Sequence, residues 1–178
     1  MNAARLITEQ LLSLTPRTSF LLAFLACVAM ELAALYFQFI VGLEPCPLCI
    51  TQRRILIGAA VVFLAGVLHN PLGRAARIYA GVGLLTTLLG MAVAAYHFTI
   101  QLLPHDELAD CGPGASYILE HMGLTDAIRA FLTGTGDCTE VVWSLFGLSM
   151  PFWVAIGFLG LAGLCVLQLA TPGRRAAN

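Results

Sequence analysis

The sequence contains no lysine, and only 11% of its 178 residues are charged, whereas 59% are hydrophobic. A water-soluble domain of this length needs more polar surface than these side chains supply. A basic tract is also lacking and the formal net charge is -1, which argues against a nucleic-acid partner. The G-x-G-x-x-G fingerprint of dinucleotide-binding proteins is missing too. The composition therefore predicts an integral membrane protein without a nicotinamide- or flavin-binding domain.

Four apolar segments are candidates for membrane-spanning helices, because about 20 apolar residues cross the hydrocarbon core. They lie approximately at residues 19–43, 50–68, 78–100 and 151–170. The apolar run of the second segment is short, so its helix must begin near Ile50 and hold Arg53 and Arg54 at the membrane boundary. The expected fold is an all-α four-transmembrane-helix bundle, a single membrane domain over residues 1–178.

The arginines predict the orientation of these spans. Six arginines lie near the two termini and in the short loop between the second and third spans: Arg5, Arg17, Arg74, Arg77, Arg174 and Arg175. The opposite side carries only three, which are Arg53, Arg54 and Arg129. Because cytoplasmic segments carry the excess of positive charge, both termini are expected in the cytoplasm. The loops at about 43–49 and 101–150 are then extracytoplasmic, and the long one is expected to hold a short amphipathic helix between Thr125 and Gly134.

The six cysteines fall into two groups. Cys27 and Cys165 lie in mid-span, where cysteine usually acts as a small apolar residue, so no function is expected of them. The other four fall on the extracytoplasmic side, and they are Cys46, Cys49, Cys111 and Cys138. Thiols in such a compartment are more often bonded or cycling than free. Four thiols allow three pairings, among which the spacing does not choose.

Cys46 and Cys49 form a C-x-x-C motif that admits several functions. Covalent haem attachment would need a histidine next, but Ile50 follows. A metal site stays open as the lesser alternative, with His105 or His121 as further ligands, although a second close cysteine pair is missing. A structural disulfide across so short a loop gains little chain entropy and tends to be strained and reducible. Redox chemistry is therefore the favoured interpretation.

Polar residues near this motif support that interpretation. Arg53 lies four residues after Cys49 on the same helix face, where positive charge favours a thiolate, whereas Arg54 is interpreted as reaching the lipid headgroups. A thiol cycle needs an electron acceptor, and a cysteine at the bilayer margin is within reach of a lipid-soluble quinone. His97 is predicted at a similar depth, either as a quinone contact or as an interfacial histidine. Glu31 is predicted to be a protonated group that hydrogen-bonds between helices.

Four segments carry a resemblance to a known family. They are ELAALYFQ at 31–38, PCPLCITQR at 45–53, CGPG at 111–114 and GDCTEVVWSLFGLSMPFW at 136–153. Together they resemble the DsbB family of quinone-dependent disulfide oxidases, which re-oxidise the dithiol oxidase DsbA in the bacterial periplasm. The resemblance implies a multi-pass protein of the bacterial inner membrane with periplasmic redox loops. It also implies a DsbA-like thioredoxin-fold partner and a membrane quinone, either ubiquinone or menaquinone.

The resemblance also implies an order for the thiol reactions. Cys111 and Cys138 would form the disulfide that the reduced partner attacks, with Cys111 in the mixed disulfide. Cys138 would then pass reduction to Cys46, which leaves Cys49 as the thiolate that meets the quinone.

Four further positions match the family near its quinone. Arg53 matches the arginine that activates the quinone, and His97 and Met150 match positions close to it. Trp143 matches a family tryptophan near the site. A reductant carrier working in the reverse direction is disfavoured, because none of the four cysteines lies toward the cytoplasm. A metal-binding or structural membrane protein with permanent loop disulfides stays open as the alternative.

Overall fold

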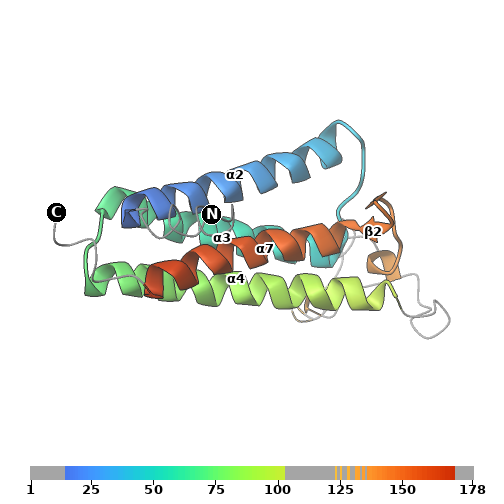
Figure 1. Ribbon diagram of the computed structural model, residues 1–178. Coiled ribbons are helices and arrows are strands. Elements are labelled where there is room, and N and C mark those ends of the chain that lie inside the picture. The colour runs from blue at the N-terminus through green and yellow to red at the C-terminus, as the bar shows by residue number, and fades with distance from the viewer. Residues whose placement is uncertain are drawn as a thin grey trace, which may run out of the picture.

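The fold is seen in a computed structural model that describes residues 15–102 and 136–170, together with positions 123, 125, 128, 131, 132 and 134. These residues include four helices long and apolar enough to cross a membrane: α2 (Pro16–Phe39), α3 (Pro47–His69), α4 (Arg74–Ile100) and α7 (Met150–Ala170). Successive helices run in opposite directions, so Pro16 and Ala170 lie at one end of the bundle (Figure 1). The predicted all-α fold with four membrane-spanning helices is confirmed.

Two helix ends differ from the predicted boundaries for local reasons. α2 ends at Phe39 rather than Leu43, because Gly42 adopts a left-handed φ of +80° and the Leu43 N–H donates back to the Phe37 carbonyl at 3.0 Å. α3 begins at Pro47 rather than near Ile50. This earlier start gives α3 a length of 23 residues, which is enough to span the hydrocarbon core.

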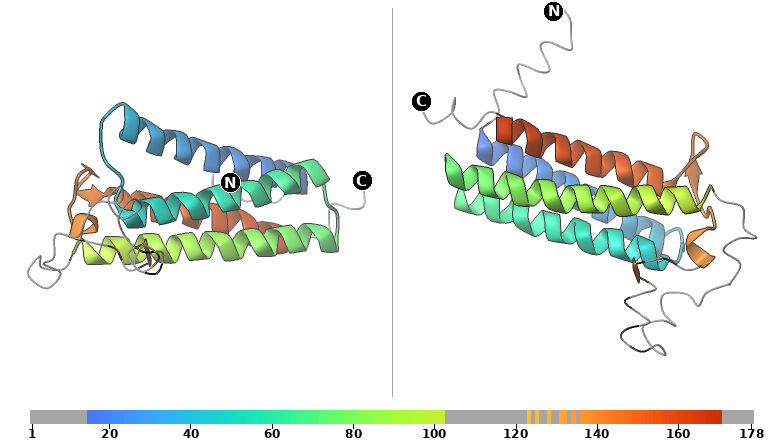
Figure 2. Two further views of the ribbon diagram at one scale, coloured as in Figure 1. Left: turned by 180° about the vertical axis from the view of Figure 1, so that it is seen from behind. Right: turned by 90° about the horizontal axis from the view of Figure 1, so that it is seen from below.

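The helices pack unevenly around the core. α4 lies along α7 over most of its length, and α3 contacts both α2 and α4, whereas α2 has little contact with α7 (Figure 2). Phe20, Phe63 and Phe158 are buried between the helices together with Cys27 and Cys165, which take the apolar role predicted for them. The weak contact between α2 and α7 leaves room for a cavity on that side of the bundle.

The described part of the long loop folds over the start of α3. It contains a 3-10 helix, η2 (Gly136–Cys138), and a hairpin of two short antiparallel strands, β1 (Ser144–Leu145) and β2 (Leu148–Ser149), that leads directly into α7. Figure 1 shows these elements at the end of the bundle opposite Pro16. The sequence did not predict the hairpin.

Much of the amphipathic helix predicted in this loop lies outside the described residues. The described positions in that segment, Thr125, Ile128, Phe131 and Leu132, are helical. The Phe131 carbonyl accepts a hydrogen bond from the Thr51 hydroxyl at 2.7 Å, which ties this segment to the first turns of α3.

Candidate active site

The cysteines of the C-x-x-C motif lie in the first turn of α3. Cys46 is the N-cap, and Pro47 follows it inside the first turn, where a fixed φ and a missing N–H suit a helix start. The Cys46 sulfur accepts a hydrogen bond from the Cys49 N–H at 3.4 Å and lies 3.3 Å from the Cys49 sulfur. The sequence predicts Cys49 near the helix start, whereas the structure places Cys46 there, because Pro47 begins the helix.

Cys138 joins this pair from the long loop. η2 holds it fully buried against Leu48 and Ile100. The Cys138 sulfur lies within 4.8 Å of the Cys46 sulfur and of a His97 ring nitrogen. One cysteine of the long loop is therefore close to Cys46, as thiol exchange between them requires. The fourth predicted cysteine, Cys111, lies outside the described residues.

His97 connects the cysteines to α3. Its Nε2 lies 3.1 Å from the Cys138 carbonyl oxygen and 3.7 Å from the Cys46 sulfur, and its Nδ1 lies 3.0 Å from the Gln52 side-chain nitrogen. Only 2% of His97 is exposed. The structure thus places His97 among the sulfur atoms, and its predicted contact with a quinone stays a prediction.

Arg53 is held by two polar side chains of α2. Its Nε and Nη2 donate to Glu31 Oε1 at 3.0 and 2.7 Å, and its Nη1 donates to Gln38 Oε1 at 2.6 Å. These bonds use three of the five guanidinium N–H groups. Glu31 connects α2 with α3, as predicted, and does so through an ion pair with Arg53. Arg54, by contrast, is exposed.

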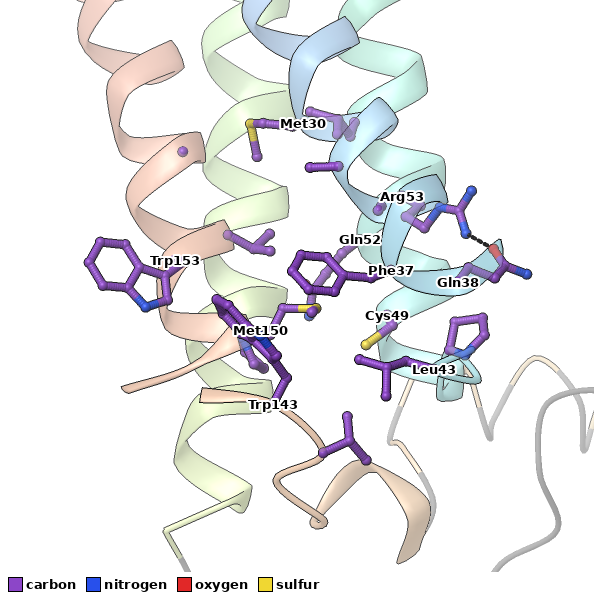
Figure 3. Close-up of a pocket in the computed structure, with 18 of the residues that line it drawn as sticks. Met30, Phe37, Gln38, Leu43, Cys49, Gln52, Arg53, Trp143, Met150 and Trp153 are labelled. Carbon is purple, nitrogen blue, oxygen red and sulfur yellow. Dashed lines mark hydrogen bonds between the residues drawn. The ribbon is translucent and has the colours of Figure 1, made fainter. Parts of the chain in front are cut away.

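An apolar cavity of about 270 Å³ lies between α2, α3 and α7. Cys49 and Arg53 contribute to its wall from α3, and Met150 and Trp153 contribute from α7 (Figure 3). Trp143, from the segment that precedes β1, closes it near the hairpin and packs on Phe37 of α2 with ring centroids 5.0 Å apart. Cys49 is thus adjacent both to Cys46 and to an apolar space large enough for a single-ring head group.

A second, more polar cavity of about 280 Å³ lies beside the first, and its lining includes His97, Asp137 and Glu140. Cys49 and Met150 line both cavities. Burial raises the pKa of the Asp137 carboxyl above its usual value, and the charges of Glu140 and Glu44 raise it further. Three carboxyl groups therefore gather beside the cysteines on the loop side.

Cys46 is the member of the Cys46–Cys49 pair whose pKa is raised. A hydrogen bond with Cys138 lowers its pKa, but the hydrogen bond to Cys49, burial and the adjacent Cys49 charge together raise it from 9.0 to about 12. Reduction of the pair therefore leaves Cys46 as a thiol. Cys49, the other cysteine of the pair, faces the apolar cavity.

The predicted residues separate into two groups in space. Cys46, Cys138 and His97 lie together under the loop, while Arg53 and Met150 line the apolar cavity, and Cys49 belongs to both groups. Gln38 and Gln52, which hydrogen-bond to Arg53 and His97, were not predicted from the sequence. Both are polar residues in otherwise apolar helices, and such residues are costly in a membrane and often functional.

The fold and the site together define a class: a four-helix membrane protein with three closely spaced cysteines at one end of the bundle. The family model of disulfide bond formation protein DsbB matches residues 16–168. The chain therefore belongs to the DsbB family, and it is a membrane thiol oxidoreductase of disulfide bond formation.

Curated relatives agree with the family match. The chain is 49% identical over 152 residues to disulfide bond formation protein B of Methylococcus capsulatus, an alignment that covers 85% of this chain and 93% of the relative. It is 43% identical over 151 residues to the protein of that name in Hahella chejuensis, covering 85% and 92%. The corresponding protein of Nitrosococcus oceani is 38% identical over 165 residues, covering 93% and 98%.

Proposed function

We propose that this protein re-oxidises a DsbA-like thioredoxin-fold protein and passes the electrons through two cysteine pairs to a membrane quinone. The site is Cys46, Cys49, Cys111 and Cys138, with Arg53, His97 and Met150 near the quinone. The observation that carries the proposal is the position of Cys49, 3.3 Å from the Cys46 sulfur and in the wall of the apolar cavity. Electrons that reach Cys49 through sulfur exchange are thus delivered to a lipid-accessible space.

The relay proceeds by thiolate attack on disulfides. The partner's thiolate attacks Cys111 of a Cys111–Cys138 disulfide, which releases the Cys138 thiolate. Cys138 then attacks the Cys46 sulfur of a Cys46–Cys49 disulfide, so that a Cys46–Cys138 bond forms and Cys49 leaves with the electron pair of the broken bond. The short separations among Cys46, Cys49 and Cys138 support this step.

Three features of the cavity suit a quinone. Its wall is mostly apolar and includes Arg53, two of whose guanidinium N–H groups are used by neither Glu31 nor Gln38. Trp153 also lines the cavity, and its buried indole Nε1 has no hydrogen-bond partner in the part of the chain that the structure describes. A carbonyl oxygen would satisfy such a donor. The quinone supplies a two-electron acceptor that is more oxidising than the partner, as the known DsbA potential of about -120 mV demands.

The orientation belongs to the same proposal. In the inner membrane of a bacterium, both termini face the cytoplasm and the redox loops face the periplasm. The arginine distribution supports this orientation. So does the position of Cys46, Cys49 and Cys138, because the start of α3 and η2 lie at the end of the bundle opposite the start of α2 and the end of α7 (Figure 1).

Turnover in detergent micelles tests the function. Purified protein with a short-chain ubiquinone or menaquinone is expected to oxidise a reduced DsbA-like protein. One quinone should be reduced for each partner molecule oxidised, as measured by the fall in quinone absorbance. Cys49→Ser should abolish quinone reduction, whereas Cys165→Ala, a change in the apolar core, should leave it intact. Undiminished turnover of Cys49→Ser would refute the relay. A partner that lacks its resolving cysteine should be trapped in a mixed disulfide at Cys111.

A metal-binding function is the second candidate, because Cys46, His97 and Cys138 bring three potential ligand atoms within 4.8 Å of one another. The hydrogen bonding of His97 disfavours it. Nε2, the ring nitrogen nearest the sulfurs, also contacts a carbonyl oxygen, which can only accept, so this nitrogen carries a proton rather than a free lone pair. Metal analysis of the reduced protein discriminates the two functions. One tightly bound zinc ion per chain that stays bound under the conditions of the turnover assay would favour the metal site.

A further inference from the structure

Gln52 and His97 form a chain of hydrogen bonds from α3 through α4 to the long loop. Gln52 is 4% exposed and His97 is 2% exposed, so neither polar group can exchange its partner for bulk water. The chain ends on the main-chain carbonyl of Cys138. A loop residue is therefore tied to two membrane-spanning helices at the position of a reacting sulfur.

The direction of every bond in this chain follows from chemistry. The Cys138 carbonyl oxygen can only accept, so His97 Nε2 must carry the hydrogen. In the neutral ring, Nδ1 is then an acceptor, and it faces the Gln52 side-chain nitrogen at 3.0 Å. The Gln52 amide donates to Nδ1 and so selects the tautomer that can bind the loop. A side chain without a donor at position 52 would leave that choice open.

We infer that Gln52 and His97 are a positioning pair for sulfur exchange, in which Gln52 fixes the His97 tautomer and His97 holds Cys138 beside Cys46. This inference rests on the proposed relay and deepens it. The step it serves is the attack of the Cys138 thiolate on Cys46, in which the Cys46–Cys138 bond forms, the Cys46–Cys49 bond breaks and Cys49 leaves as the thiolate. No oxidant or reductant enters this step.

The geometry explains why a positioning pair is needed at this point. Cys49 belongs to α3 and stays next to Cys46 by virtue of the helix itself. Cys138 instead lies in the short 3-10 helix of a loop, whose described contacts with α3 are few. The Nε2–H group also lies 3.7 Å from the Cys46 sulfur, so the same donor faces both partners of the new bond. A displacement of about 1 Å between reacting atoms can cost about 100-fold in rate.

Two substrates separate sulfur exchange from quinone reduction. A reduced DsbA-like partner must work through Cys138, whereas dithiothreitol can attack the Cys46–Cys49 disulfide directly. His97→Leu and Gln52→Leu should lower partner-driven turnover by roughly ten- to hundred-fold, while dithiothreitol-driven quinone reduction, measured at saturating quinone, should fall by a much smaller factor. In acid-quenched single turnovers, the fraction of chains with a Cys46–Cys138 disulfide should fall in parallel.

Conservative and matched variants complete the design. His97→Gln keeps an N–H group near the Nε2 position and should recover most of the partner-driven rate. Gln168→Leu changes another buried glutamine, whose amide has no hydrogen-bond partner among the described residues, and should leave both rates intact.

Each contrary outcome has a distinct meaning. Equal loss of both rates in His97→Leu, without recovery in His97→Gln, would overturn the inference and make His97 a quinone contact. Parent-like partner-driven turnover of Gln52→Leu would overturn the role of Gln52. Failure of the parent protein with both thiol substrates would refute the proposed function itself.

Discussion

Arg53 of α3 donates two hydrogen bonds to a single carboxylate oxygen of Glu31 on α2, at 3.0 and 2.7 Å. This ion pair lies beside the apolar cavity, and each side chain is about one-fifth exposed (23% and 20%). It neutralises the guanidinium charge within a membrane-spanning segment, where an unpaired charge is costly. Two Arg53 N–H groups are not used by Glu31 or Gln38. The ion pair therefore holds Arg53 in place and leaves it able to donate hydrogen bonds to another acceptor.

The first prediction concerns this pair. Glu31→Gln removes the countercharge of Arg53 and should destabilise the protein, because a partly buried cation is left unpaired. A double-mutant cycle with Arg53→Gln should give a coupling free energy of about 1–3 kcal/mol by thermal or denaturant unfolding in micelles. Arg54→Gln is the matched control, since Arg54 is exposed and should change stability by less than about 0.5 kcal/mol. A coupling free energy near zero would contradict the ion pair.

The pair also shows which parts of the structure the sequence could predict. Span positions depend on hydrophobic length, and the division of the cysteines depends on where the spans lie, so both follow from local composition. The contact of Arg53 with Glu31 depends on how α2 and α3 rotate against each other, which single-chain hydropathy does not specify. A comparison of the membrane depths of Arg53 and Glu31 would have indicated this contact. Both residues lie a few turns inside helices that meet at the same end of the bundle.

The helix start and the loop were predictable to different degrees. Proline directly before an apolar run is typical of the first turn of a helix, and this pattern could have placed the start of α3 at Pro47. The position of His97 beside Cys138 could not be read from the sequence, because it depends on a loop contact between residues 41 positions apart. The β1–β2 hairpin turns at Phe146, whose φ of 52° is unusual for a bulky residue and is not expected from its type.

The second prediction concerns the reactivity of Cys46. Because its pKa is raised to about 12, less thiolate is present at pH 8 than in an ordinary thiol. In the fully reduced protein, alkylation of Cys46 by iodoacetamide should be at least about tenfold slower than in the denatured chain. Its rate should continue to rise above pH 10, where the denatured chain has reached its plateau.

A Cys49→Ala variant provides the control for Cys46. It removes the hydrogen bond that contributes most to raising the Cys46 pKa, so alkylation of Cys46 should become faster and its pH profile should move toward neutral pH. Mass spectrometry of digested peptides distinguishes the cysteines. Identical pH profiles in the folded and denatured chains would refute a raised pKa.

The third prediction concerns Trp153 as a donor to the quinone. Its buried indole N–H has no partner among the described residues, and Trp153 is one of the residues that line the apolar cavity. Trp153→Phe keeps an aromatic ring but removes the donor, so the KM for quinone should rise by roughly three- to ten-fold, the equivalent of one hydrogen bond. Sulfur exchange with the partner should be unchanged, as measured by the Cys46–Cys138 disulfide formed in a single turnover. A parent-like KM would show that Trp153 does not bind the quinone.

The fourth prediction tests the cavity by reducing its volume. A Cβ at Gly157 would lie 2.5 Å from Cε of Met30, which lines the cavity, so Gly157→Ala must displace the Met30 side chain. The KM for quinone should rise, with little change in the rate at saturating quinone. Gly160→Ala is the matched control on the same helix, because its Cβ would meet nothing within 4 Å. Equal effects of the two variants would mean that this cavity is not the quinone site.

The fifth prediction concerns Gly134, which supports Cys138 from the loop. Its φ is +82°, and a Cβ there would lie 2.9 Å from Leu48 and 3.5 Å from the Cys138 sulfur. Gly134→Ala should therefore strain the backbone and also displace the side chains that bury Cys138, so that exchange between Cys138 and Cys46 slows by about tenfold or more. The hairpin glycine Gly147 has a similar φ of +78° but no neighbour within 4 Å, so Gly147→Ala carries the backbone strain alone. If both alanine variants slow partner-driven turnover equally, backbone strain suffices to explain the loss, whereas a loss specific to Gly134→Ala identifies the contact beneath Cys138 as the cause.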